Sequence, residues 1–311
     1  MTKVFIDGSS GTTGLQIRQR LDARRDLTIL TLPETQRKDP AARADAMNGA
    51  DVVFLCLPDA AAIEAVGFVE NPETCVIDTS TAHRVDPGWV YGFPELGKAA
   101  EIAAAKRIAN PGCHATGFIS VVYPLVRSGL LDPAALLSCF SLTGYSGGGK
   151  TMIADYEAPE RDTLLSAPGI YALGQKHKHL PEMQTVCGLA HVPVFCPIVD
   201  DYLKGMATTV PLHLAQLKGA PTLEQVRAAY ADFYAGQKLI HVATAEESAA
   251  YGKLYGNARA GRDSLEIVVA GNDAQCTVTA VFDNLGKGAS GAAIQNMNLV
   301  LGLEPTAGLV L

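Results

Sequence analysis

The sequence predicts an α/β protein of two parts: a parallel α/β domain, then an α+β domain with a mostly antiparallel sheet. In the first third of the 311 residues, apolar strand candidates alternate with helical stretches, which is typical of parallel strands covered on both faces. From about residue 138, longer strand candidates are separated by glycine- and proline-rich turns. A chain of this length can bury two ordinary cores. We therefore expect one domain at 1–112, joined by the C-terminal helix 290–311, and a second at 113–289.

The elements of the first domain are expected to alternate along the chain. Strands are predicted at 4–6, 27–32, 52–57 and 75–78, and helices at 15–21, 41–47 and 60–68. The second domain has predicted strands at 137–143, 192–195, 206–214, 266–269 and 275–283, and a predicted helix at 223–234. The last helix is predicted over 291–301, after a glycine-rich turn.

Charge and cysteine content exclude several classes of protein. The chain has 25 Lys and Arg against 32 Asp and Glu, a net charge of -7, so we expect no nucleic-acid or membrane-surface partner. Its seven cysteines are scattered without a Cys-x-x-Cys pair, which argues against a disulfide framework or a metal site. The chain opens on a strand and has no membrane-length apolar stretch, so a cytoplasmic protein is expected.

A glycine-rich turn directly follows the first strand and opens a helix. Its spacing is G-x-x-G-x-x-G, and this position at the start of a βαβ series predicts a Rossmann-type dinucleotide site. A turn without a ligand is the alternative. The residues expected to hold the dinucleotide phosphates are Gly8, Ser10, Gly11, Thr12, Thr13 and Gly14.

The choice of cofactor depends on the residues after the second strand. Glu34 lies about 20 residues past the last glycine, where an acid would bind the ribose of NAD. Arg37 and Lys38 follow closely, and two cations suit the 2′-phosphate of NADP. A solvated loop is the alternative for this pair. We expect NADP(H) as the cofactor.

Cys113 lies at the start of a predicted helix with an apolar face. Asn110 can cap this helix and Pro111 suits its first position. The unpaired N–H groups and the dipole of a helix start favour a thiolate, and can lower a thiol pKa from about 8.5 by one or more units. Cys113 is therefore a candidate nucleophile, with a small buried packing residue as the alternative.

Three loops carry further candidate residues. The segment 175–182 concentrates two histidines, and an imidazole beside the thiolate would be an acid–base group; His177 is the first choice and His179 the second. Arg84 follows the strand 75–78 at its carboxyl end and can clamp a phosphate or carboxylate, although a surface ion pair is the alternative. The loop 143–150 allows a ligand to approach the backbone closely.

These features together resemble the semialdehyde dehydrogenases that act on acyl phosphates. The resemblance runs nearly end to end. Its specific parts are Asn110-Pro111-Gly112-Cys113, Tyr91-Gly92-Phe93-Pro94-Glu95-Leu96 and Lys287-Gly288-Ala289. It implies a dinucleotide-binding domain and a catalytic domain that also forms a homo-oligomer, a dimer or a tetramer.

The resemblance also implies roles for individual residues. Cys113 would be the nucleophile, His177 the acid–base group, and the region from Lys287 to Asn296 would approach the nicotinamide. The residues expected near the substrate are Ser80, Arg84, Asn110, Ser146, His179 and Glu182.

The residue before the cysteine narrows the expected substrate. Aspartate-semialdehyde dehydrogenases usually have asparagine there, whereas this chain has Gly112, which favours a glutamyl substrate. The resemblance therefore implies the NADPH-dependent reduction of N-acetyl-gamma-glutamyl phosphate to N-acetyl-glutamate semialdehyde, through a cysteine thioester, in arginine biosynthesis. The alternatives are a reductase of aspartyl phosphate, and a non-catalytic NADP-binding regulator with Cys113 as a packing residue or redox sensor.

Overall fold

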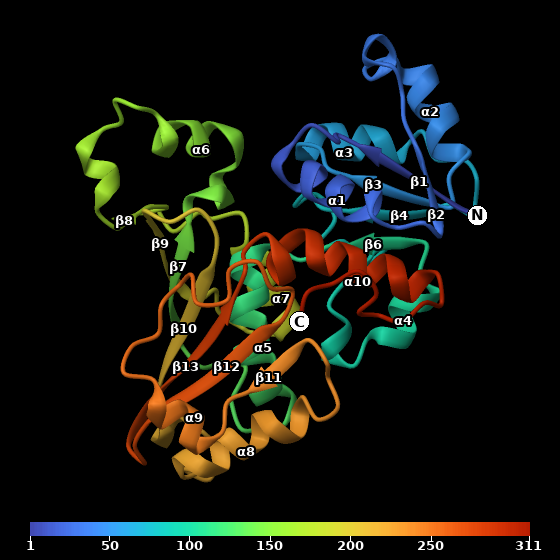
Figure 1. The fold of residues 1–311 in the computed structure, drawn as a ribbon. Helices are drawn as coiled ribbons and strands as arrows, with labels where there is room; N and C mark the ends of the chain where they lie inside the picture. The colour runs from blue at the N-terminus through green and yellow to red at the C-terminus, as the bar shows by residue number, and fades with distance from the viewer. The chain divides into compact units, whose positions relative to one another are not determined.

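The computed structural model describes all residues 1–311 and divides them into two compact units. The first unit is Met1–Gly112 with Ala289–Leu309, and the second is Cys113–Gly288 with Val310–Leu311. In Figure 1 the first unit contains the blue elements and the red C-terminal helix. The chain therefore leaves the first unit after Gly112 and returns to it at Ala289 for the last helix.

The first unit is a six-stranded parallel sheet in the order β2-β1-β3-β4-β6-β5, which confirms the predicted parallel α/β fold. Its strands are β1 (Thr2–Asp7), β2 (Leu27–Leu30), β3 (Val52–Leu55), β4 (Cys75–Asp78), β5 (Val90–Tyr91) and β6 (Arg107–Ala109). Its helices are α1 (Thr12–Asp22), α2 (Pro40–Asn48), α3 (Asp59–Val66), α4 (Ala99–Ala104) and α10 (Gly291–Val300).

Both faces of this sheet are buried, and alternate residues of each strand serve the two faces. In β3, Val52 and Phe54 belong to one core cluster, together with residues of α1, α4 and α10. Val53 and Leu55 belong to the other cluster, with residues of α2 and α3. Continuous apolar strands are what a sheet covered on both sides requires, because its side chains alternate between the faces.

The second unit has a seven-stranded mixed sheet in the order β11-β12-β13-β10-β7-β9-β8. Four of its six strand pairings are antiparallel, so the predicted mostly antiparallel sheet is confirmed. The strands are β7 (Ser138–Gly144), β8 (Gly169–Ile170), β9 (Val194–Asp200), β10 (Met206–His213), β11 (Ile240–Val242), β12 (Leu265–Gly271) and β13 (Gln275–Phe282). The helices are α5 (Cys113–Arg127), α6 (Gly149–Glu157), α7 (Leu180–Cys187), α8 (Leu223–Phe233) and α9 (Ala245–Ala250).

Helix α5 packs on β10 and β13 and continues through an internal proline, Pro124. Proline has no N–H, so the carbonyl of Ser120, four residues earlier, lacks its helical partner. The hydroxyl of Tyr234, just after α8, donates to that carbonyl at 2.8 Å. The carbonyl that Pro124 leaves without a helical partner is thus satisfied by the side chain of Tyr234.

The glycine-rich turn depends on two of its three glycines for steric reasons. Gly8 has a φ of +82°, and a Cβ there would lie 2.3 Å from the carbonyl oxygen of Cys56. A Cβ on Gly14 would lie 2.4 Å from the carbonyl oxygen of Gly8. Gly11 differs, because the nearest atom to a Cβ there is 3.5 Å away. The close approach of main-chain carbonyls to this turn therefore requires glycine at positions 8 and 14, and not at position 11.

We expect Gly8→Ala to lower the free energy of unfolding by at least about 1–3 kcal/mol, because it adds a clash to a left-handed backbone. Gly11→Ala is the matched control and should unfold like the parent. Urea denaturation followed by circular dichroism measures both. Equal stabilities for the two variants would contradict the steric explanation.

Candidate active site and cofactor site

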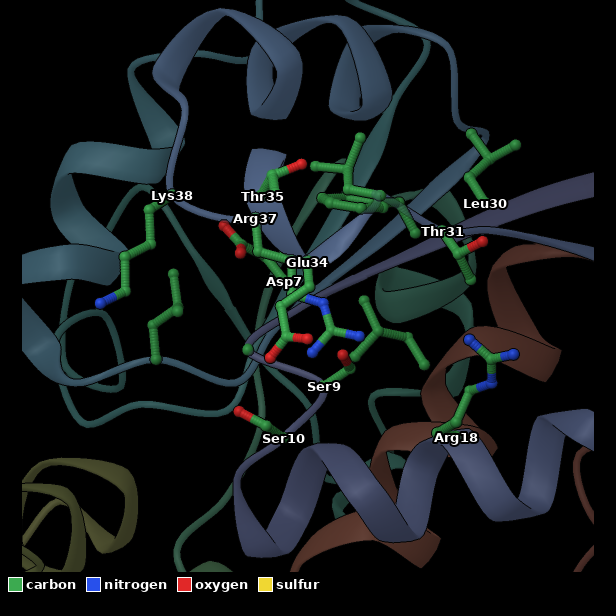
Figure 2. A pocket seen from close by; sticks show the side chains of 15 residues that line it. Asp7, Ser9, Ser10, Arg18, Leu30, Thr31, Glu34, Thr35, Arg37 and Lys38 are labelled. Atoms are coloured by element: carbon green, nitrogen blue, oxygen red, sulfur yellow. The ribbon is translucent and has the colours of Figure 1, made fainter.

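A cavity of about 440 Å³ lies beside the glycine-rich turn in the first unit. Gly8 and Ser10 line it from the turn, and Glu34, Arg37 and Lys38 line it from the segment after β2. Figure 2 shows the side chains of these three charged residues beside Ser9 and Ser10. The predicted phosphate turn and the residues predicted to select the cofactor therefore share one cavity.

The other predicted phosphate-binding residues belong to the start of α1 rather than to the lining of this cavity. Gly11 directly precedes the helix, whose first residues are Thr12, Thr13 and Gly14. No side chain caps this helix, and its first turn contains no acidic residue. The N–H groups of its first turn therefore lack a side-chain acceptor, which suits a bound phosphate.

Two further arginines lie near this cavity and each has a carboxylate partner. Arg43 of α2 donates from Nε and Nη2 to Oδ2 of the buried Asp7, at 3.1 and 2.8 Å. Arg18, which the sequence analysis did not single out, lines the cavity and donates to Asp22 at 2.7 Å. Arg18 could have been found from its position one helical turn beyond Gly14, on the same helix.

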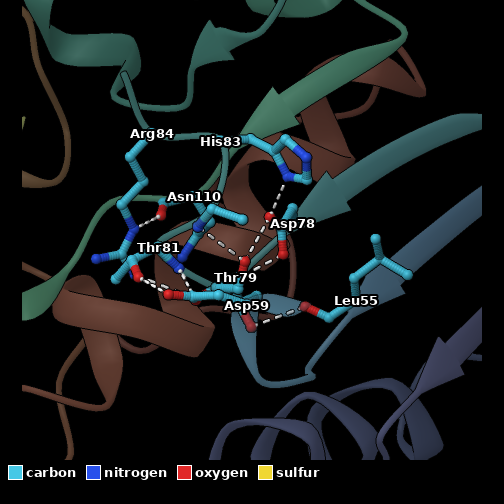
Figure 3. A network of polar contacts seen from close by, with 10 residues as sticks. Leu55, Asp59, Asp78, Thr79, Thr81, His83, Arg84 and Asn110 are labelled. Atoms are coloured by element: carbon cyan, nitrogen blue, oxygen red, sulfur yellow. Dashed lines mark hydrogen bonds and ion pairs between the residues drawn. The ribbon is translucent and has the colours of Figure 1, made fainter. Parts of the chain in front are cut away.

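The loop after β4 is organised around a buried carboxylate, that of Asp78 (Figure 3). The Ser80 hydroxyl and N–H both donate to it, at 2.7 and 2.9 Å. Nδ1 of His83 lies 2.6 Å from Oδ2 of Asp78, the same oxygen that accepts from the Ser80 hydroxyl. The His83 ring stacks on Trp89 with centroids 4.1 Å apart. The predicted substrate residue Ser80 is therefore part of a network that gives this loop its shape.

Arg84 is buried and is bonded to main-chain carbonyls. Its Nε donates to the oxygen of Asn110 at 3.0 Å and its Nη2 donates to the oxygen of Thr79 at 3.1 Å. Figure 3 shows the side chain reaching the Asn110 carbonyl. The loop after β4 is thereby joined to the strand end that precedes Cys113, a link that the sequence analysis did not predict.

The predicted start of the cysteine helix is wrong: α5 begins at Cys113 and not at Pro111. Asn110 does not cap it, because its side chain is engaged elsewhere in the first unit. Its Nδ2 donates to the carbonyl of Ala289 at 3.0 Å, and its Oδ1 accepts from Asn296 at 3.2 Å. Asn296 also donates to the carbonyl of Gly92 at 3.0 Å. The predicted substrate residue and the predicted nicotinamide residue are thus direct partners.

Cys113 is a half-buried cysteine that forms no disulfide, and it is the first residue of α5, where the N–H groups of a helix start are found. A turn of π-helix, Gly286–Ser290, follows β13. A Cβ on Gly288 of this turn would lie only 2.9 Å from the Cβ of Cys113, so glycine lets the turn approach the thiol. Lys287, predicted near the nicotinamide, is buried in the same turn.

The second unit brings both predicted histidines together around His114. The ring centroids of His177 and His179 lie 5.4 and 5.7 Å from that of His114, and 4.7 Å from each other. Nδ1 of His177 accepts from the N–H of His179 at 3.1 Å. A neutral imidazole that accepts at Nδ1 carries its proton on Nε2, so this contact defines the tautomer of His177.

Three of the predicted substrate residues lie in the second unit. His179 and Glu182 are both buried, with Nε2 of His179 4.0 Å from Oε1 of Glu182 at the start of α7. Ser146, in the turn after β7, accepts from Nδ2 of Asn284 at 3.0 Å. Oδ1 of Asn284 accepts in turn from the N–H of Gly205 at 2.9 Å. Ser146 is therefore part of a buried link between three segments.

The sequence analysis missed His114 and Tyr171. Nε2 of His114 lies 2.7 Å from the Tyr171 hydroxyl, and Nδ1 lies 2.7 Å from the Ser141 hydroxyl. Burial lowers the pKa of His114 to about 3, and the neighbouring His177 and Lys178 act in the same direction. The signal for His114 was its place directly after Cys113, but its partners come from distant strands and loops.

The structure contains no group of three or more His, Cys, Asp or Glu side chains placed to hold a metal ion. It also contains no helix that is both long and apolar enough to cross a membrane.

Comparison with known families identifies the class of protein. The family description "Semialdehyde dehydrogenase, NAD binding domain" matches residues 3–105, and "Semialdehyde dehydrogenase, dimerisation domain" matches residues 113–284. The chain belongs to the semialdehyde dehydrogenase family, and is an oxidoreductase whose first matched part is the nicotinamide-cofactor domain.

Curated relatives narrow the comparison within this family. The chain is 47% identical over 308 residues to N-acetyl-gamma-glutamyl-phosphate reductase of Burkholderia cenocepacia, covering 98% of both chains. It is 47% identical over 306 residues to the reductase of the same name from Brucella anthropi, covering 96% of this chain and 98% of that one.

Solved structures share the fold at much lower identity. Aspartate semialdehyde dehydrogenase II from Vibrio cholerae, in complex with ASA, matches with a TM-score of 0.73 and 16% identity, covering 97% of this chain and 98% of that chain. The enzyme from Francisella tularensis matches with a TM-score of 0.72 and 14% identity, covering 97% and 100%. At these identities the similarity defines the fold alone.

Proposed function

We propose that this chain is an NADPH-dependent reductase of N-acetyl-gamma-glutamyl phosphate, which forms N-acetyl-glutamate semialdehyde and phosphate in arginine biosynthesis. The name shared by relatives that match almost the whole chain supports the substrate. The observation that carries the chemistry is the half-buried thiol of Cys113 at the first position of α5, in the same unit as His177.

The residues of the second unit can support a thioester route. The Cys113 thiolate attacks the acyl carbon, a C–S bond forms, and the C–O bond to phosphate breaks. N–H groups of the first turn of α5 can stabilise the oxyanion, an effect worth about 3 kcal/mol of barrier per donor. When bound, NADPH supplies the hydride that reduces the thioester. Collapse of the resulting alkoxide then releases the semialdehyde and restores the thiolate.

The contact between His177 and His179 refines the expected role of His177. An imidazolium would carry a proton on Nδ1, which would oppose the N–H of His179 at 3.1 Å. We therefore assign to His177 a neutral resting state in which Nε2–H donates to the thiolate or to the oxyanion. The proton that the overall reaction consumes ends on the released phosphate.

NADP is the proposed cofactor because Arg37 and Lys38 line the same cavity as the phosphate turn. Arg43 has a buried ion pair with Asp7 and Arg18 is paired with Asp22, so both cations already have protein partners. A 2′-phosphate near Arg37 and Lys38 would gain charge-assisted hydrogen bonds that the hydroxyl of NAD cannot make. Glu34 lies in the same cavity and is the residue that could favour NAD.

A homo-oligomer is proposed for the second unit. One face of its sheet carries exposed apolar side chains, among them Phe140, Ile170 and Val194. The register pairs Phe140 with Cys196 and Ile170 with Ile198, so these strands present one continuous outer face. The matched family description names this region a dimerisation domain, which supports self-association through that face.

The proposed reaction is tested most directly in reverse. With phosphate and NADP, the purified protein should oxidise N-acetyl-glutamate semialdehyde much faster than aspartate semialdehyde. Cys113→Ser should abolish turnover and spare NADP binding, because its hydroxyl stays protonated near neutral pH. Cys276→Ala is the control and should keep parental activity, because Cys276 lies in β13, outside the strands of the proposed self-association face. Activity of Cys113→Ser within tenfold of the parent would exclude the thioester route.

Cofactor choice is tested by replacing both cations of the cavity. Arg37→Ala with Lys38→Ala should weaken NADPH more than NADH, since each lost hydrogen bond to the phosphate is worth about 1.5–3 kcal/mol. Arg18→Ala, whose partner is Asp22, should change the preference much less. Dissociation constants from fluorescence titration give the ratio. If the ratio of the NADPH and NADH dissociation constants were unchanged in the double variant, Arg37 and Lys38 would be solvated residues that do not contact the cofactor.

The choice between the histidines is tested by asparagine, whose Oδ1 can still accept from a main-chain N–H while Nε2 is lost. His177→Asn should lower kcat by about 10²–10³-fold, the range for losing a hydrogen-bond donor to the oxyanion. His179→Asn should do much less, because its ring packs against the other two histidines and Nε2 faces Glu182. A larger loss for His179→Asn would reverse the assignment.

A further inference from the structure

Four side chains form a continuous chain of hydrogen bonds in the second unit. Thr208 of β10 and Ser141 of β7 are register partners, and their hydroxyl oxygens lie 2.8 Å apart. Ser141 continues to Nδ1 of His114 at 2.7 Å, and Nε2 of His114 continues to the Tyr171 hydroxyl at 2.7 Å. The chain runs from the interior of the sheet to the loop that carries the site histidines.

The buried end of this chain decides which way its protons point. Thr208 and Ser141 are fully buried, and Ser141 is the hydrogen-bond partner of the Thr208 hydroxyl. If Ser141 donated to Thr208, the Thr208 proton would be buried without an acceptor, which is costly. Thr208 therefore donates to Ser141, and the Ser141 proton is left for Nδ1 of His114.

His114 passes this polarity on to Tyr171. A neutral imidazole that accepts at Nδ1 donates at Nε2, so the Tyr171 oxygen is an acceptor from His114. Burial lowers the pKa of His114 to about 3, so the ring stays neutral at physiological pH and the chain keeps one direction. The phenolic proton of Tyr171 then points away from His114 and remains available as a donor.

Cys113 is the acceptor that the surroundings of Tyr171 favour. It directly precedes His114, whose Nε2 lies 2.7 Å from the Tyr171 hydroxyl, so the phenol is held beside the start of α5. The charge of a Cys113 thiolate also acts on Tyr171, where it adds to burial in raising the pKa of the phenol. A phenol with a raised pKa keeps its proton beside a thiolate instead of transferring it.

The loop after Tyr171 is held in an unusual conformation. Ala172 and Gln175 have φ angles of +52° and +53°, in a region of backbone conformation that residues other than glycine rarely adopt. The Gln175 amide compensates by pairing with both main-chain groups of Phe195, each at 2.8 Å. Backbone strain kept in place by such contacts is common at functional sites.

We propose that Tyr171 is a further catalytic residue, whose phenolic hydrogen bond stabilises the Cys113 thiolate and whose orientation is set by Thr208, Ser141 and His114. The proposal rests on the function proposed above only in taking Cys113 as the nucleophile. The other titratable groups near this thiol or near His114 in the second unit are His177, Lys178, His179, Glu182 and Lys287, the last of which is buried in the turn whose Gly288 approaches Cys113.

The test measures the alkylation rate of Cys113 by iodoacetamide against pH, with mass spectrometry to isolate its peptide. Tyr171→Phe removes a donor to the thiolate, so the thiol should hold its proton to higher pH and the alkylation midpoint should rise by about 1 unit. Tyr251→Phe is the matched control, because it removes a hydroxyl bonded to Glu266 and should leave the midpoint unchanged.

A second variant keeps the shape of the ring. Replacement of Tyr171 by 3-fluorotyrosine makes the phenol a stronger donor with little change in volume, and the midpoint should fall. A parental midpoint in a folded Tyr171→Phe protein, or no downward shift with 3-fluorotyrosine, would overturn the proposal. The experiment uses neither substrate nor NADPH, so its outcome is independent of whether the proposed reductase assay succeeds.

Discussion

The first unit depends on the complete hydrogen bonding of Asn110, three residues before the candidate nucleophile. Its N–H donates to Asp78, its carbonyl accepts from Arg84, and its side chain joins Ala289 and Asn296. These partners come from three segments, so the end of β6 is held by the neighbouring strand, by the loop after that strand and by the C-terminal region. A residue with all its polar groups engaged leaves little freedom to the backbone that follows it.

In the second unit, buried side-chain hydrogen bonds fix the position of a residue next to Cys113. The hydroxyls of Thr208 and Ser141 are paired across two strands, and this pair orients an imidazole next to Cys113. Buried polar groups of this kind are tolerable because each one has its partner, and a satisfied network defines a single arrangement. The sheet thus orients the His114 ring and also provides the surface on which α5 packs.

The sequence could predict the features that repeat or that depend on neighbours along the chain. The alternation of apolar strand candidates with helical stretches predicted the parallel sheet. The spacing of the glycines predicted the turn whose backbone requires Gly8 and Gly14. The start of α5 was misplaced because Asn110 looks like a cap, and nothing local shows that Ala289 and Asn296 occupy its side chain. His114 was missed for the same reason. The short elements β5, α4 and β6 carry too few residues to show a period.

The place of α10 in the first unit has a consequence for how the chain is made. Ala293, Ile294 and Met297 complete one face of a core whose other members come from the first 108 residues. A ribosome that adds roughly 5–20 residues per second needs about 10–40 s to travel from the end of β6 to this helix. During that time one face of the N-terminal sheet is covered only by α1 and α4, and the apolar residues that α10 will bury stay exposed. Nascent chains should therefore depend on chaperones until the last helix emerges.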